Sequence, residues 1–443
     1  MSRLTLSSLE YKKDLILHYQ SLADLNGFVL LESTDQLRGR YDIVTALPYD
    51  SLKVSQESSV DEVFGKLQNM MIHTPSVCGL PFQGGVIGYL SYDFGERLQG
   101  LRGNTHPANE MPLVDLNCYD WAIVTDHKLH KVHLVAANRS PDTVKIVDEI
   151  TSRWKKASLS SESFSLTHPF KPLISKEEYR QAISAIQQDL IRGRFYQVNF
   201  TQPFLGEYRG NPWEMYKRIR INNPVPYSAF LRSTEGDVLS FSPERFLLME
   251  AGRVQTSPIK GTIKCSSKPR IDQALREYLQ QSTKNRAENV MIVDLLRNDF
   301  GKFAKIGTVK TTSLCDVESY HGLHHLVSTV TAEYAEDVTP LDVFKACFPG
   351  GSITGAPKVE AMKMIREQER YSRGVYCGSI AYFSNHGRFD SNIAIRTLTA
   401  KPNTLYLSAG GGIVIDSNWE EEYLECFTKI QAILHEFRPK SSR

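Results

Sequence analysis

Short runs rich in apolar, β-branched and aromatic residues dominate the first third of the chain, and this pattern predicts β-strands. Most of these runs end at turn residues, as antiparallel strands do. We expect strands over residues 28–33, 41–46, 84–92, 121–126 and 132–137. Residues 158–172 are rich in Ser and Pro and lack periodicity. They predict a linker between an N-terminal β-rich region (1–165) and a C-terminal region (170–443).

Helical spacing takes over after this linker. Ser175 with Glu178 three residues later forms a capping-box pattern, and apolar residues then recur at helical spacing up to Gly193. We expect helices over 176–192, 272–297, 357–369 and 419–437, and strands over 378–384, 389–400 and 404–409. Antiparallel strands with helices inserted between groups of strands predict an α+β fold.

Composition excludes several classes of protein. The chain has 443 residues, with 52 Lys plus Arg against 50 Asp plus Glu and no block of like charges, which argues against nucleic acid or a membrane surface as partner. Charges within the first fifteen residues leave no apolar core for a signal peptide, and no apolar run is long enough to span a membrane. The seven cysteines are scattered without a CxxC pair, which argues against disulfides and a thiolate zinc site. We expect a cytoplasmic protein.

The last predicted helix carries a charged stripe. Glu422, Glu425 and Lys429 recur at i, i+3 and i+7, so they share one helix face. Taken alone, such a stripe is usually a solvated face. The glycine run at 410–412 just upstream favours a binding site instead, because glycine lets backbone N–H groups approach an anion closely. A carboxylate or phosphate fits such a site.

A second acidic position, Glu288, lies on another predicted helix. Mg²⁺ takes oxygen ligands, often from only one or two carboxylates. Facing helices that carry Glu288 and Glu425 could supply that pair, although ordinary ion pairing explains most helix charges. The adjacent His324 and His325 point in different directions and lack a third ligand at suitable spacing, so a hydrogen-bonding or core role is favoured for them.

Two further segments carry candidate chemistry. Residues 348–358 differ from an ATP-binding phosphate loop, because Ala356 and Pro357 precede Lys358, so they form either a structural turn or a cradle for a carboxylate. Lys260 follows a strand-like run; an exposed lysine is protonated and a poor nucleophile, and only burial or a neighbouring positive charge would activate it. Glu244 either acts as a general acid or pairs with an arginine.

Together these segments resemble the chorismate-utilising enzyme family. The resemblance covers nearly the whole chain and is densest after Tyr196. It implies two packed antiparallel β-sheets with helices on the outside, and an active site in the C-terminal part. The motifs that carry it lie at 196–199, 242–246, 258–262, 286–289, 325–328, 348–358, 395–397, 408–414 and 422–425 with Lys429.

Two positions separate the branches of this family. Gln197 stands where members that add water to chorismate carry a lysine. Lys260 lies in Pro-Ile-Lys-Gly-Thr, where anthranilate synthases carry Pro-Ile-Ala-Gly-Thr. The resemblance therefore implies the branch that aminates chorismate at C4, toward para-aminobenzoate and folate. The alternatives are anthranilate synthase component I and a non-catalytic, tryptophan-binding regulatory subunit.

The resemblance also implies roles for single residues. Lys260 would add covalently at C2 of chorismate and Glu244 would act as the acid and base. Glu288 and Glu425, supported by Glu422, would hold Mg²⁺. Asn285 replaces the acidic residue usual in the family, which implies weaker metal binding. The residues that would receive the substrate are Gly261, Thr262, His325, Tyr376, Arg396, Gly410, Gly411, Gly412 and Lys429.

The resemblance implies two further binding partners. No cysteine lies in a nucleophile elbow, so the chain lacks a glutaminase site, and a partner glutamine amidotransferase (component II) would deliver ammonia. A tryptophan pocket, regulatory or merely structural, would lie in the N-terminal region. Its residues would be Leu31, Ser33, Arg40, Tyr41, Pro226, Tyr227 and Ser228.

Overall fold

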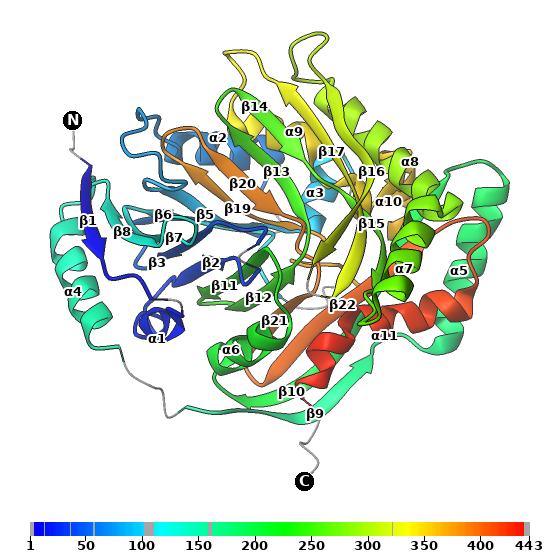
Figure 1. Ribbon diagram of the computed structural model, residues 1–443, viewed down its shortest axis with the longest axis horizontal. Helices are drawn as coiled ribbons and strands as arrows, with labels where there is room; N and C mark the ends of the chain where they lie inside the picture. Colours follow the sequence, from blue (N-terminus) through cyan, green and yellow to red (C-terminus); the bar gives the residue numbers. More distant parts are fainter. Residues whose placement is uncertain are drawn as a thin grey trace.

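Two antiparallel β-sheets pack face to face, and helices cover their outer surfaces (Figure 1). The computed structural model describes residues 4–12, 14–35, 37–55, 58–101, 110–157, 162–320 and 322–437. The predicted α+β fold with two packed antiparallel sheets is confirmed. Among the described residues, no helix is long and apolar enough to cross a membrane.

The larger sheet contains twelve strands of the described chain. In chain order they are β1 (Thr5–Leu9), β2 (Val29–Glu32), β3 (Tyr41–Thr45), β7 (Trp121–Asp126), β8 (Lys131–Ala136), β9 (Phe164–Pro172), β10 (Gln197–Gly210), β11 (Tyr227–Ser233), β12 (Gly236–Ser242), β18 (Gly355–Ala356), β21 (Thr397–Lys401) and β22 (Thr404–Ile413). They lie in the order β1-β8-β7-β3-β2-β11-β12-β21-β22-β10-β18, with β9 also paired to β10.

The smaller sheet contains ten strands of the described chain. They are β4 (Asp50–Val54), β5 (Gly85–Leu90), β6 (Val114–Tyr119), β13 (Arg245–Glu250), β14 (Arg253–Thr256), β15 (Ile259–Lys264), β16 (Lys310–Tyr320), β17 (Leu323–Glu333), β19 (Ser379–Ser384) and β20 (Phe389–Asn392). Their order is β15-β17-β14-β13-β20-β19-β5-β6-β4, with β16 also paired to β17.

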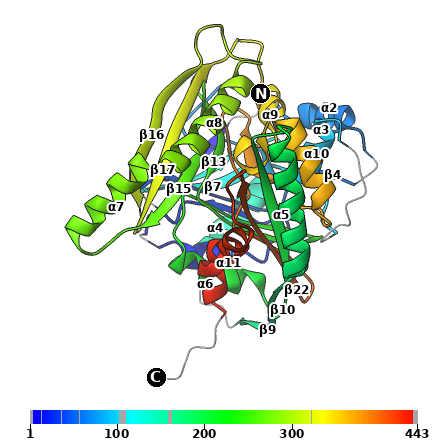
Figure 2. The ribbon, with the colours of Figure 1, turned by 90° about the vertical axis from the view of Figure 1, so that its right-hand side faces the viewer.

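Helices flank both sheets. They are α1 (Ile16–Gln20), α2 (Val60–Met70), α3 (Tyr92–Leu98), α4 (Thr143–Lys155), α5 (Lys176–Ile191), α6 (Pro212–Asn222), α7 (Pro269–Gln281), α8 (Thr283–Phe300), α9 (Pro340–Cys347), α10 (Lys358–Gln368) and α11 (Trp419–His435). Figure 2 shows α5, α10 and α11 beside β10 and β22, at one end of the larger sheet.

The side-chain alternation of the strands explains why both faces of each sheet are covered. Val29 on β2 and Ile87 on β5 point into one apolar cluster between the sheets, together with Tyr382 on β19. Their neighbours point outward: Phe230 on β11 packs edge-on against Trp213 of α6, with ring centroids 5.1 Å apart. Burial on both faces therefore gives the near-continuous hydrophobic runs seen in the sequence.

The two regions separated by the predicted linker are interleaved in the fold. Leu31 of β2 pairs with Ala229 of β11 in the larger sheet. Gly88 of β5 pairs with Ala381 of β19 in the smaller sheet. Residues 1–165 and 170–443 therefore do not build separate sheets.

Most of the predicted elements are confirmed within one to three residues. This holds for the five early strands, for the strand at 378–384, and for the helices at 176–192, 357–369 and 419–437. The capping box is also present: Ser175 Oγ accepts from the Glu178 N–H at 3.1 Å, and the Glu178 carboxylate accepts from the Ser175 N–H at 2.7 Å.

The predicted linker over 158–172 is wrong for its second half. Residues 164–172 form the edge strand β9, which pairs with β10, while residues 158–161 lie outside the described part of the chain. Phe164 stacks on Tyr208 of β10 with ring centroids 5.5 Å apart. Because an edge strand uses only one row of its hydrogen-bonding groups, it tolerates the prolines that obscured the strand pattern.

Three other predicted elements have different limits. The helix over 272–297 is two helices, α7 and α8, because Ser282 between them is extended and its side chain caps α8. The strand over 389–400 is split into β20 and β21, which belong to different sheets. The strand over 404–409 continues to Ile413 and includes the glycine run.

We expect Ser175→Ala to destabilise the protein by about 1 kcal/mol, because α5 loses the acceptor for the N–H of Glu178. Ser184→Ala is the matched control: this exposed serine lies in the middle of the same helix and bonds only the carbonyl of Arg180. Urea unfolding followed by circular dichroism measures both. Equal midpoints for the two variants would contradict a stabilising capping box.

Candidate active site

The site lies where the chain passes from one sheet to the other. Glu244 stands between β12 of the larger sheet and β13 of the smaller, and Arg396 stands between β20 and β21. The two passages are bonded together: Ser242 Oγ donates to the Ile393 carbonyl at 2.6 Å, and the Ile393 N–H donates to the Glu244 carbonyl at 3.1 Å. One acidic and one basic side chain are thereby held at the gap between the sheets.

Lys260 reaches this gap because β15 contains a bulge. Lys260 pairs with Leu326 and Thr262 with His325, so the register shifts by one residue at Gly261. Gly261 has a φ of +70°, and a Cβ there would lie 2.9 Å from the Asn285 side chain of α8. A glycine is therefore required at the bulge, both for its backbone conformation and for the close approach of α8.

Lys260 is surrounded by charged groups of three other elements. Burial lowers the pKa of its ammonium; Lys429 of α11 also lowers it, while Glu288 of α8, Glu244 and Glu425 of α11 raise it. The side chain that was predicted to be the nucleophile thus lies beside the predicted acid and between the two predicted metal-binding helices. A lowered pKa increases the fraction of neutral amine, the form that can attack an electrophile.

Glu244 is 6% exposed. Burial raises the pKa of its carboxyl to about 7, although Ser352, Lys260 and the Ile259 N–H all favour the charged form. The carboxyl is therefore close to half protonated at neutral pH and can both give and take a proton. Between the two alternatives left by the sequence, the surroundings favour an acid over a carboxylate paired with arginine.

The acidic stripe of α11 faces the glycine run of β22. A Cβ on Gly411 would lie 2.8 Å from a carboxylate oxygen of Glu422 and 3.7 Å from one of Glu425. Lys429 Nζ lies 2.6 Å from Glu425 Oε1 and 2.8 Å from the carbonyl of Gly410. Gly411 is therefore needed for the close packing of the charged helix face against the strand.

Carboxylate oxygens suit Mg²⁺, and Glu288, Glu422 and Glu425 supply them from two helices. Glu422 is buried, accepts a hydrogen bond from Ser417 Oγ at 2.8 Å, and has a pKa raised by burial and by Glu425. Among the described residues, these three carboxylates do not form a cluster in which one oxygen from each lies within 4.8 Å of the other two. One or two of these carboxylates, completed by substrate oxygens and water, would suffice for Mg²⁺, and its binding here stays a prediction.

His325 and Arg396 are near enough for the charge of Arg396 to contribute to the shift in the pKa of His325. Thr262 Oγ1 lies 2.9 Å from His325 Nδ1, and burial, with Arg38 and Arg396, lowers the pKa of the imidazole to about 4. His325 is therefore neutral at pH 7. Burial also lowers the pKa of Arg396, and no carboxylate of the described chain forms an ion pair with its guanidinium. A partly buried cation without a counter-charge is a ready receptor for an anion.

Tyr376 is buried against α11, close to Cys377 and Cys426, and its pKa is raised well above the usual value by burial. Gly410 and Gly412 belong to β22, opposite Thr201 and Asn199 of β10. The remaining predicted substrate-binding residues are therefore gathered around the same end of the larger sheet. Their contact with a substrate stays a prediction.

From the sequence, Gln197 served only to separate the branches of the family, and no role was predicted for Ser352 and Asn289, which also build the site. Gln197 is fully buried, lies against Gly412, and neither amide atom of its side chain has a hydrogen-bond partner among the described residues. Ser352 bonds Glu244 and belongs to the glycine-rich turn that the sequence had marked. Asn289 is fully buried and accepts from Ser328 Oγ, which fixes α8 against β17 next to Glu288.

The lysine of the glycine-rich turn has a structural role. Lys358 Nζ lies 2.6 Å from Asp299 Oδ2 and donates to the carbonyl of Cys347 at 2.8 Å. Lys358 and Asp299 are both buried. The contacts of Lys358 therefore join the start of α10 to the ends of α8 and α9. Residues 348–358 were predicted to form either a structural turn or a cradle for a carboxylate. The buried ion pair of Lys358 supports the structural turn.

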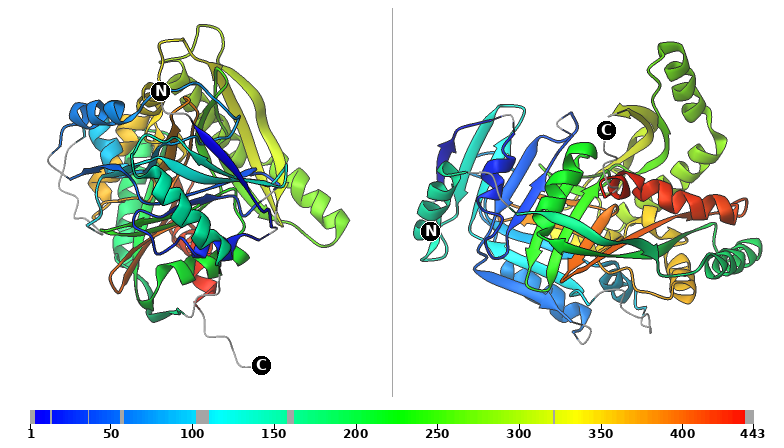
Figure 3. Two further views of the ribbon diagram at one scale, coloured as in Figure 1. Left: turned by 90° about the vertical axis from the view of Figure 1, so that its left-hand side faces the viewer. Right: turned by 90° about the horizontal axis from the view of Figure 1, so that it is seen from below.

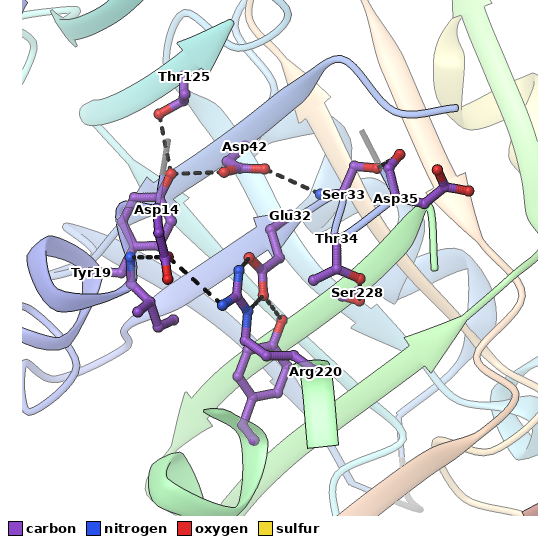
Figure 4. Close-up of polar contacts among 12 residues, drawn as sticks. Asp14, Tyr19, Glu32, Ser33, Thr34, Asp35, Asp42, Thr125, Arg220 and Ser228 are labelled. Atoms are coloured by element: carbon purple, nitrogen blue, oxygen red, sulfur yellow. Dashed lines mark hydrogen bonds and ion pairs between the residues drawn. The ribbon is translucent and has the colours of Figure 1, made fainter. Parts of the chain in front are cut away.

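The predicted tryptophan-binding residues lie together on β2, β3, β11 and the segments before them. Leu31 and Ser228 are on paired strands, and a Cβ on Gly39 would meet Ser33 Oγ and come within 3.4 Å of the Pro226 carbonyl. The Ser33 N–H donates to Asp42 at 3.1 Å, within a buried polar network that also joins Glu32 to Arg220 (Figure 4).

Arg40 makes a two-pronged ion pair with Asp126 and stacks over Tyr41 at 4.8 Å. Arg245 lies over the ring of Tyr227 at 5.1 Å. The residues predicted for the pocket are thus brought together by the fold. Tryptophan binding itself stays a prediction.

The chain is similar to known proteins along almost its whole length. A family model described as "chorismate binding enzyme" matches residues 26–435. Aminodeoxychorismate synthase component 1 of Salmonella typhimurium is 39% identical, over 97% of this chain and 98% of that protein. Anthranilate synthase component 1 of Acetivibrio thermocellus is 36% identical, over 80% of this chain and 75% of that protein.

A solved structure gives the same result for the fold. The crystal structure of anthranilate synthase component I from Streptococcus pneumoniae TIGR4 superposes with a TM-score of 0.81 at 29% sequence identity, covering 89% of this chain and 92% of that one. The match includes strands of both sheets, and the family model spans Glu244, Lys260, Glu288, Arg396 and Glu425. The chain belongs to the chorismate binding enzymes.

Proposed function

We propose that the protein is the chorismate-aminating component of an aminodeoxychorismate synthase, which replaces the C4 hydroxyl of chorismate with an amino group. One observation carries this proposal: Lys260, in place of the alanine of anthranilate synthases, is partly buried beside Glu244 and within the field of Glu288 and Glu425. The 39% identity to relatives of that name over nearly the full length supports the same choice. Anthranilate synthase component I is the alternative, supported by the 36% identity of a relative over 80% of this chain.

The residues at the gap between the sheets suit a covalent route. The neutral amine of Lys260 adds at C2, the two ring double bonds shift toward C4, and the C4 hydroxyl leaves as water with a proton from Glu244. Ammonia then adds at C4, the double bonds return, and the Lys260 amine is expelled from C2. The net change is one hydroxyl for one amino group, with no oxidation, and one hard substitution becomes two easier ones.

Charge complementarity supports chorismate, a dianion, as the substrate. Arg396 is a partly buried guanidinium without a carboxylate partner in the described chain, and His325 beside it is neutral. Mg²⁺ held by Glu288 and Glu425 would neutralise the ring carboxylate. Gly410 to Gly412 would let the backbone of β22 approach the substrate closely.

The same reasoning gives the proposed partner and setting. The relatives are named component 1, which implies a second component. Because no cysteine of this chain lies in a nucleophile elbow, we propose a glutamine amidotransferase that supplies ammonia, within the cytoplasmic synthesis of para-aminobenzoate and folate. The tryptophan pocket would bind its ligand between β2, β3 and β11.

Chorismate and Mg²⁺ without ammonia should convert part of the protein to a covalent adduct. We expect its mass to rise by that of chorismate minus water after acid quenching, and the adduct to disappear on addition of ammonium. Lys260→Ala should form neither the adduct nor the C4-amino product, while its circular dichroism stays unchanged. Lys264→Ala, an exposed lysine on the same strand, is the control and should behave as wild type.

Full turnover by Lys260→Ala would contradict the covalent role. The product separates the two candidate enzymes, because aminodeoxychorismate keeps its enolpyruvyl group whereas anthranilate is aromatic and fluorescent.

The pH dependence should report on Glu244. Its pKa of about 7 means that the protonated fraction falls as pH rises through 7. At a fixed concentration of free ammonia, kcat should therefore decrease above pH 7. Glu244→Gln should lower kcat by about 10²- to 10⁴-fold and remove this decrease. Glu235→Gln, in the exposed turn before β12, is the control; an unchanged pH profile in Glu244→Gln would remove the acid role.

Metal dependence should be sensitive to Glu288. Glu288→Gln removes one carboxylate oxygen, so the Mg²⁺ concentration for half-maximal rate should rise by roughly 10- to 100-fold. Asp294→Asn changes a carboxylate that is exposed on the same helix and should have no effect. If a chelator left the wild-type rate unchanged, the assignment of Mg²⁺ would be wrong.

A further inference from the structure

A cluster of metal-ligating side chains lies outside the proposed active site. Cys265 directly follows β15, Asp272 lies in the first turn of α7, and His324 is on β17. One donor atom from each residue lies within 4.8 Å of the others. Figure 3 shows α7 projecting from the body of the molecule, and Figure 2 shows it beside β15 and β17. None of the three residues takes part in the proposed reaction.

The imidazole of His324 stands at the centre of this cluster. Its side chain is buried, with Nε2 3.1 Å from Asp272 Oδ1. On the other side of the ring, Nδ1 lies 2.6 Å from Ser319 Oγ and 3.7 Å from Cys265 Sγ. Both nitrogens therefore face polar groups, and the ring links the helix to the two strands.

The backbone holds the other two ligands in place. The Ser266 N–H donates to Asp272 Oδ1 at 2.7 Å, which fixes the carboxylate at the start of α7. The Cys265 N–H donates to the Gly322 carbonyl at 2.7 Å, which joins the end of β15 to the turn before β17. The chain around them thus fixes the Asp272 carboxylate and the backbone of Cys265, while the Cys265 side chain remains free to rotate.

We propose that Cys265, Asp272 and His324 bind a thiophilic divalent cation, with Zn²⁺ as the occupant. A thiolate, an imidazole and a carboxylate together form a donor set that Zn²⁺ takes and that Mg²⁺, which prefers oxygen alone, does not. With metal–ligand bonds of about 2.0–2.3 Å, neighbouring donors of a tetrahedral ion lie roughly 3.3–3.8 Å apart. Asp272 Oδ1 and His324 Nε2, 3.1 Å apart, are close to that range, and one donor atom of each of the three residues lies within 4.8 Å of the others.

The protons balance in a simple way. His324 keeps its single proton on Nδ1, where Ser319 Oγ accepts it, and Nε2 binds the cation beside Asp272. The Cys265 thiol releases its proton to solvent and turns its short side chain toward the cation, and water takes the fourth position. No oxidant or reductant is involved.

The position of the site gives the cation a structural task. Cys265 lies five residues after Lys260 on the same stretch of chain, and His324 immediately precedes His325. A cation between β15, β17 and α7 therefore ties together the wall that carries Lys260, Thr262 and His325. Zn²⁺ should raise the thermal unfolding temperature of the protein without replacing Mg²⁺ in the reaction.

Co²⁺ is the probe that reports on the thiolate, because a sulfur-to-cobalt charge-transfer band appears only when a cysteine is a ligand. We expect the full chain, freed of metal with a chelator, to develop this band with one equivalent of Co²⁺. Zn²⁺ should abolish the band by displacing Co²⁺, whereas excess Mg²⁺ should leave it unchanged. Absence of a saturable band would overturn the proposal.

Variants locate the site. Cys265→Ser should lose the band, and Asp272→Asn should weaken Co²⁺ binding about tenfold or more, both with unchanged circular dichroism. Cys78→Ser, which alters another partly exposed free cysteine, should keep the band. A band that survives in Cys265→Ser would overturn the assignment. Glu288→Gln should also keep the Co²⁺ band. A failure of the proposed Zn²⁺ site is therefore distinguishable from a failure of the proposed Mg²⁺ chemistry.

Discussion

The site depends on two adjacent passages of the chain between the sheets. Ser242 at the end of β12 donates to the Ile393 carbonyl, its hydroxyl accepts the Glu244 N–H at 3.2 Å, and the Ile393 N–H donates to the Glu244 carbonyl. These bonds satisfy backbone groups in the segments that connect the two sheets, where no strand partner is present. They also fix Glu244 and, three residues beyond Ile393, Arg396 at the same gap.

Burial at this gap changes the chemistry of the side chains that line it. The low-dielectric surroundings disfavour charge, so the pKa of Glu244 rises to about 7 while those of Lys260, His325 and Arg396 fall. For Glu244 and Lys260, the shift moves the group toward the neutral form that proton transfer or nucleophilic attack needs, whereas Arg396 stays a cation. In the proposed function, dianionic chorismate would supply the counter-charge that Arg396 lacks in the described chain.

The site also requires side chains of neighbouring elements to pack closely against the backbone of β22. Glycine allows this close packing at two positions of the strand. Gly411 admits the carboxylates of α11 against β22, and Gly412 admits the amide of Gln197, which a Cβ would meet. The proposed cation site follows a different principle, since its ligands are brought together by α7 folding back on β15 and β17. The paired strands β15 and β17 would then carry both the reactive lysine and part of a structural metal site.

The sequence by itself determined the elements with a clear local pattern, such as α5 with its Ser175–Glu178 cap and the buried strands β5 and β7. Its motifs also named Lys260, Glu244, Glu288 and Glu425, because each stands in a segment typical of the family. Only the tertiary structure decided that β9 pairs with β10 and that residues 389–400 divide between two sheets. It alone brought Cys265, Asp272 and His324 together. Periodicity reports the contacts of neighbouring residues, whereas these contacts join residues far apart in the chain and are set by packing.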